Sequence, residues 1–176
     1  MCFYVDKKWC NMVFVREALC APDNELLSIS LRPFYLPREF PQLFDTLVYI
    51  HPGANASRAI EHITDNIHKL DSISPDAPKF ILWDFNHCSL NKTLKTYHQY
   101  VTCPTPFNKT IDLCFGTVPG VYMSLALPPL GSADHNSVQA KLQALVYDIL
   151  PSTTVVFSYA IGSRKLSANE QFFVGA

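Results

Sequence analysis

The chain has 176 residues, of which 48% are apolar, and its formal net charge is −1. This length and composition predict one folded domain with an ample hydrophobic core. The near-zero net charge excludes a protein that binds nucleic acid through its overall electric field alone. The longest apolar runs are far short of the ~20 residues that a spanning helix needs, so no membrane association is expected.

The first eight residues place no long apolar stretch behind a basic start, as a signal peptide would. We therefore expect an intracellular protein, nuclear or cytoplasmic, with no defined protein partner. The six cysteines contain no Cys-x-x-Cys pair, so zinc-site spacing is absent. Free thiols are expected, although a disulfide framework remains possible from the cysteine count.

The first elements expected along the chain are strands. Residues 2–5 and 12–15 predict two strands joined by a turn at Lys7-Lys8. Residues 27–31 alternate apolar side chains with serines, which is the period-2 pattern of a half-buried strand. Three prolines within residues 33–41 then predict a surface loop.

A strand, a helix and a further strand are expected next. Residues 44–50 predict the first strand, and residues 60–70 carry apolar side chains at helical spacing, with Asn55 or Ser57 available as the N-cap. The apolar residues 80–83 predict the second strand. Strands that alternate with helical stretches indicate an α/β sandwich.

Polar side chains follow or interrupt apolar runs at three places, namely at Asp84 and Asn86, at Asp112, and at Asp134-His135. An acid at the end of a buried strand is costly unless it meets a cation or a hydrogen-bond partner. We therefore interpret the three places as parts of one convergent polar site.

In order, these motifs resemble the late motifs of the endonuclease/exonuclease/phosphatase family, which read Gly-Asp-x-Asn, Ile-Asp-Tyr-like and Ser-Asp-His. The family includes apurinic endonucleases and the endonuclease domains of non-LTR retrotransposons. Residues 48–52, Val-Tyr-Ile-His-Pro, resemble its Tyr-x-Pro element. Residues 25–40, 48–52 and 127–131 most resemble the retrotransposon domains. The whole resemblance covers roughly residues 2–138.

The resemblance implies a two-sheet α/β sandwich, incomplete at the N-terminus, that hydrolyses phosphodiesters. Asp84 would orient or deprotonate the attacking water, and Asn86 would hold that water or a phosphate oxygen. Asp112 would orient His135, which would hydrogen-bond the phosphate. Tyr49 would add a phenolic donor.

The resemblance also implies a metal ion and a substrate. Mg²⁺ or Mn²⁺ would be bound on the side of Asp134, with Asp84 and Asn86 as further ligands. DNA would be the substrate, and the candidates for contacting it are three lysines, Lys92, Lys95 and Lys109.

Several departures from the family pattern predict impaired hydrolysis. Trp83 stands where the family has glycine, Ala133 stands where it has serine, and Pro106-Phe107 occupies a loop where relatives tend to carry arginine and glycine. The asparagine and the metal-binding glutamate of the family's first two motifs have no counterpart, since neither Glu17 nor Glu25 fits. We therefore expect an N-terminally truncated domain.

Residues 1–139 are expected to form this partial domain, and residues 140–176 an unrelated or weakly packed tail. Within the tail, residues 140–150 predict a short amphipathic helix and residues 153–159 a strand. Two alternatives to the nuclease remain. One is a catalytically inactive remnant with at most weak nucleic-acid binding, and the other is a phosphatase of the same fold, which the retrotransposon-like stretches disfavour.

Overall fold

A computed structural model describes residues 1–34, 36–86, 88–104, 110, 112–120, 122–128, 137–142, 154–157 and 171–175. Within these ranges the chain forms strands and one helix, in the order β1 (Cys2–Asp6), β2 (Val13–Cys20), β3 (Asn24–Leu31), β4 (Leu43–Ile50), α1 (Ala56–Ile73), β5 (Lys79–Asp84), β6 (His98–Gln99), β7 (Asp112–Gly116), β8 (Tyr122–Leu127), β9 (Ser137–Leu142), β10 (Thr154–Phe157) and β11 (Gln171–Gly175).

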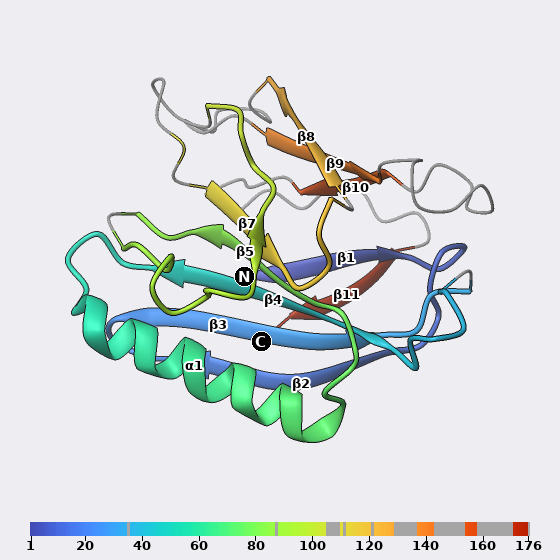
Figure 1. The fold of residues 1–176 in the computed structure, drawn as a ribbon, viewed down its shortest axis with the longest axis horizontal. Coiled ribbons are helices and arrows are strands. Elements are labelled where there is room, and N and C mark those ends of the chain that lie inside the picture. The colour runs from blue at the N-terminus through green and yellow to red at the C-terminus, as the bar shows by residue number, and fades with distance from the viewer. Residues whose placement is uncertain are drawn as a thin grey trace.

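The centre of the fold is a mixed six-stranded sheet with the strand order β2-β3-β4-β5-β7-β6 (Figure 1). β2, β3 and β4 are antiparallel neighbours, β5 is parallel to β4, and β7 is antiparallel to β5. A parallel pair requires a crossover, which α1 provides here. The sheet and its crossover helix confirm the expected α/β class. Because β4 and β5 are parallel, their carboxyl ends lie at the same end of the sheet, and open α/β sheets bind ligands at that end.

Helix α1 covers one face of this sheet (Figure 1). Its apolar residues, including Ala59 and Ile63, pack on Leu26 and Val48 from the sheet. The Asn55 side chain caps its first turn by accepting hydrogen bonds from two backbone amides, at 3.1 and 3.3 Å. The predicted helix is confirmed, with Asn55 rather than Ser57 as its N-cap.

Replacing Asn55 with alanine is expected to lower the free energy of unfolding by about 1 kcal/mol, because two amides of the first helical turn lose their acceptor. Ser57→Ala serves as the matched control, since Ser57 contributes only its backbone amide to the cap. Urea unfolding of both variants measures the difference. Equal losses of unfolding free energy in the two variants would show that the Asn55 cap does not stabilise the helix.

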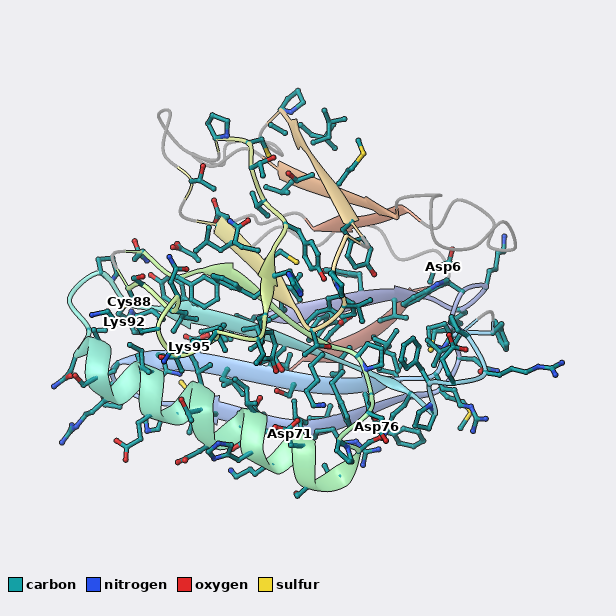
Figure 2. The ribbon with its side chains drawn as sticks, in the orientation of Figure 1. Asp6, Asp71, Asp76, Cys88, Lys92 and Lys95 are labelled. Carbon is teal, nitrogen blue, oxygen red and sulfur yellow. The ribbon has the colours of Figure 1, made fainter. Side chains whose placement is uncertain are left out.

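The connection from α1 to β5 is held by a buried lysine. Lys79 is only 3% exposed, and its Nζ donates to the carbonyls of Pro75 at 2.9 Å and Ala77 at 3.1 Å. It also pairs with Asp71 at 2.9 Å. Asp71 lies on the last turns of α1, and Asp76 lies in the loop that follows (Figure 2). The clamp fixes where β5 starts and therefore where Asp84, its last residue, is placed.

Two smaller sheets, β1-β11 and β8-β9-β10, lie over the other face of the six-stranded sheet (Figure 1). Phe3 and Val5 of β1, Tyr122 of β8 and Val138 of β9 pack into one apolar layer with this face. β11 pairs with β1, so strands from the two ends of the chain lie side by side. Within the described part of the chain, no helix has the length and hydropathy that crossing a membrane requires.

The expectation that the strand over residues 27–31 is half-buried was wrong. Ser28 and Ser30 are as buried as the apolar residues between them, at 0% and 1% exposure. The Ser28 hydroxyl lies 2.8 Å from Thr46 Oγ1 and donates to Asn66 Oδ1 at 2.9 Å. Serine alternation predicts solvent exposure only when nothing covers the polar face, and here Asn66 of α1 satisfies the hydroxyl.

The helix expected over residues 140–150 was wrong in the part that the structure describes, because residues 140–142 belong to β9. β9 is the middle strand of its sheet, between β8 and β10, so backbone pairing overrides the helical apolar pattern that begins at Leu142. Residues 143–150 lie outside the described ranges. The strand expected over residues 153–159 is confirmed over residues 154–157 as β10, and residues 153, 158 and 159 lie outside the described ranges.

Candidate functional site

Four polar side chains form a row across one end of the six-stranded sheet. Glu25 is the register partner of Tyr49, and Asp84 is the register partner of Asp112. The parallel register of β4 and β5 pairs Leu47 with Leu82, so Tyr49 and Asp84, each two residues further on, are neighbours. Because side chains alternate along a strand, all four point to the face opposite α1.

Asp84 is held rigidly at the end of β5. It is 5% exposed, and its Oδ1 accepts the backbone amide of Asn86 at 2.9 Å. Asp112, the first residue of β7, lies directly opposite, and such cross-strand pairs bring Cβ atoms within about 5 Å. Two carboxylates at this separation stabilise a cation or a proton donor that binds between them.

Asn86 ties the end of β5 to the end of β4. Its Nδ2 donates to the carbonyl oxygen of Ile50 at 2.8 Å. Its φ of 47° is left-handed, a conformation that asparagine adopts more readily than most residues. This bend and the hydrogen bond to Ile50 hold the chain after β5 against the end of β4, next to Tyr49. Asn86 therefore positions the strand ends that carry the site.

Tyr49 is half-buried, and its ring packs edge-on against His51, with 4.9 Å between centroids. Within the described residues the Tyr49 hydroxyl makes no hydrogen bond. The phenol can therefore donate to a ligand at this end of the sheet. His51 follows β4, and its backbone amide donates to Asp23 at 3.1 Å.

The structure therefore brings together four residues that the sequence singled out: Tyr49, Asp84, Asn86 and Asp112. Asp134 and His135 lie outside the described residues, as do Ala133, Pro106-Phe107 and Lys109. The side chain of Trp83 is likewise outside what the structure describes. The convergence expected from the sequence is thus observed for the first four residues, and the roles assigned to all six remain predictions.

Sequence reasoning missed two neighbours of this site, Glu25 and His51. By its place in the sequence Glu25 does not fit the family's upstream glutamate, but the pairing of β3 with β4 places it opposite Tyr49. The signal that could have found it is the length of the β3–β4 hairpin, which sets the register. Glu17, by contrast, lies on the other face, where Lys69 binds it at 2.6 Å and Asn66 at 3.0 Å.

Two of the three candidate lysines for contacting DNA lie in the loop between β5 and β6. Lys92 and Lys95 are both exposed, at the same side of the molecule as the carboxyl ends of β4 and β5 (Figures 1 and 2). The loop is anchored by Leu90 and Leu94, which pack in the same apolar cluster as Ile63 of α1.

The oxygen atoms of Asp84, Asn86 and Asp112 have the chemistry that Mg²⁺ prefers in proteins. Among the residues described, however, no three His, Cys, Asp or Glu side chains are close enough to hold a metal ion together. A divalent cation held here by the described residues would take one or two protein carboxylates and complete its coordination with water and substrate oxygens. All six cysteines are free thiols.

No protein-family model matches this chain, and no curated protein matches it at a significant level. Among solved structures, the crystal structure of an endonuclease/exonuclease/phosphatase family protein from Bacteroides thetaiotaomicron is similar to it, with a TM-score of 0.48. The alignment covers 80% of this chain and 73% of that one, at 10% sequence identity. At this identity no residue of that protein can be carried over to this chain.

Proposed function

We propose that this chain is a divalent-metal-dependent DNA endonuclease domain of the endonuclease/exonuclease/phosphatase type, derived from a non-LTR retrotransposon polyprotein. The row of Tyr49, Asp84 and Asp112, with Asn86 folded against its edge, is the observation that supports the proposal. We further propose that the fold is the two-sheet sandwich of this type. The six-stranded sheet would form one layer, and the strands of the smaller sheets would form the other.

In this proposal Asp84 orients the attacking water and accepts its proton, because its carboxylate is already held by the Asn86 amide. Asn86 holds the water or a phosphate oxygen. Asp112 orients His135, whose imidazole donates to the phosphate, and the Tyr49 phenol donates from the side of β4. Asp134, with Asp84 and Asn86, would hold a Mg²⁺ or Mn²⁺ ion. That ion would offset the charge that develops on the phosphate.

Weak hydrolysis is expected of the 176 residues alone, because the glutamate that holds the metal in this family has no counterpart among them. Losing a metal ligand or a transition-state contact commonly lowers activity on the order of 10²-fold or more. A catalytically inactive remnant that binds nucleic acid weakly is the second candidate function. Trp83 in place of a glycine next to Asp84 favours it.

Nicking of supercoiled plasmid in Mg²⁺ tests the proposal. Three proteins are compared, namely the chain itself, its Asp84→Ala/His135→Ala double variant, and the chain extended upstream by the family's first two motifs. We expect slow nicking by the first, none by the second, and a rate at least about 100-fold higher for the third. EDTA should stop every reaction.

Each other outcome has a definite meaning. Nicking that survives the double substitution or EDTA would place the activity elsewhere and contradict the proposed site. A folded, cooperatively melting extended chain that does not nick would contradict the nuclease and support the remnant.

A further inference from the structure

A half-buried carboxyl group lies at the apolar layer between the six-stranded sheet and the smaller sheets. Asp45 is in the middle of β4, between Ile29 of β3 and Phe80 of β5. Its side chain lines a cavity of about 10 Å³, which holds about one water molecule. The other lining residues are apolar, aromatic or a thiol: Trp9, Leu43, Phe80, Leu82, Cys114 and Tyr122.

Among the described residues, Asp45 has no hydrogen-bond donor and no cation as a partner. These apolar surroundings disfavour the ionised carboxylate relative to the neutral carboxyl group. Burial accordingly raises the pKa of Asp45 from 3.8 to about 7.

The titratable groups that face Asp45 do not compensate its charge. They are Cys10 from the turn before β2, Cys114 from β7 and Tyr122 from β8, with Tyr100 next to Tyr122. Burial, with smaller contributions from Asp45, raises the pKa of Cys10, Cys114 and Tyr122 above their ordinary values. All of them are therefore neutral at physiological pH, and none supplies a positive charge.

We propose that Asp45 is a proton-operated lock between the six-stranded sheet and the layer that contains β8. With its proton, the carboxyl fits the cavity as a neutral group and hydrogen-bonds one water molecule. Without its proton, the charge draws further water into the cavity and loosens the packing of Trp9 and Tyr122 on the sheet. Near-neutral pH thereby controls how firmly the two layers are joined.

The sign of the effect follows from proton linkage. The folded state holds this proton more tightly than the unfolded state, so the unfolding equilibrium constant rises as the pH increases from about 4 to about 7. With pKa values of 3.8 and about 7, Asp45 alone raises that constant roughly 100-fold between pH 5 and pH 8. Above pH 8 its contribution is constant.

Two measurements on the whole chain test the lock. In the protein labelled with ¹³C at aspartate carboxyls, one resonance should titrate near pH 7 and be missing from Asp45→Asn. Urea unfolding from pH 5 to pH 8 should show the roughly 100-fold rise relative to Asp45→Asn, whose amide cannot ionise. Asp76→Asn, which removes an exposed loop carboxylate, should keep the wild-type pH dependence.

Hydrogen exchange then separates local loosening from a general loss of stability. The global rise in unfolding accelerates exchange throughout the wild-type protein, so the local effect is the excess in β8. Relative to Asp45→Asn at the same pH, amides of β8 should be accelerated several-fold more than amides of α1 at pH 8, and by the same factor as α1 at pH 5.5. The lock is disproved if all aspartates titrate near pH 4, or if the two proteins share one pH dependence. Equal acceleration in α1 and β8 would equally overturn it.

Discussion

Asp84→Asn is expected to lower Mg²⁺-dependent nicking by the upstream-extended chain at least about 100-fold, which corresponds to about 2.7 kcal/mol of transition-state stabilisation. Asparagine is nearly the same size and keeps an oxygen that can accept the Asn86 amide, now 2.9 Å from the carboxylate. It loses the negative charge that would take the proton of the attacking water. The variant therefore changes the chemistry while preserving the geometry.

The matched control for this prediction is Asp76→Asn, which removes an exposed carboxylate in the loop after α1 (Figure 2). Its nicking rate should equal that of the unaltered extended chain. Thermal melts of both variants should lie close to the parent, so that lost activity is not confused with lost fold. A fully active Asp84→Asn would remove this aspartate from the mechanism and with it the proposed assignment.

Gly116→Ala is expected to destabilise the fold by about 3 kcal/mol, at the upper end of what overpacking usually costs. A Cβ at Gly116 would lie 2.6 Å from Phe80 Cδ1 and 2.8 Å from Tyr100 Cε2, closer than real Cβ contacts. The two rings cannot easily withdraw. Each packs edge-on against Tyr122, with 5.3 and 5.6 Å between centroids, and the Tyr100 hydroxyl donates to the Val118 carbonyl.

Denaturant unfolding of Gly116→Ala and Gly53→Ala measures this effect. Gly53 is the control, because a Cβ there would meet nothing within 4 Å. Adding Phe80→Leu should recover part of the loss in Gly116→Ala, since the leucine side chain leaves space beside the new methyl group, and the double-mutant cycle isolates that coupling. A loss below 1 kcal/mol, or additive effects of Gly116→Ala and Phe80→Leu, would show that the rings move aside freely.

Local patterns in the sequence were sufficient for the elements around the site. Apolar residues at helical spacing predicted α1, with Asn55 or Ser57 as its cap, and the apolar run before Asp84 predicted β5. These signals are short-range, because capping and amphipathic periodicity are decided within a few turns of chain. The order of polar residues at strand ends likewise predicted that Tyr49, Asp84, Asn86 and Asp112 lie close together, while their catalytic roles stay a prediction.

Tertiary structure decided what depends on neighbours distant in the sequence. The sequence pattern predicted a solvent-facing Ser28, but Asn66 of α1 covers it and accepts its hydrogen bond. The pattern over residues 140–142 predicted a helix, but their backbone pairs with neighbouring strands. Glu25 joined the row beside Tyr49 only through the β3–β4 register. Asp45, a single acid between Phe44 and Thr46, gave no local sign of lining an apolar cavity. Burial and strand register are set by the whole packed chain, and no short window of residues contains them.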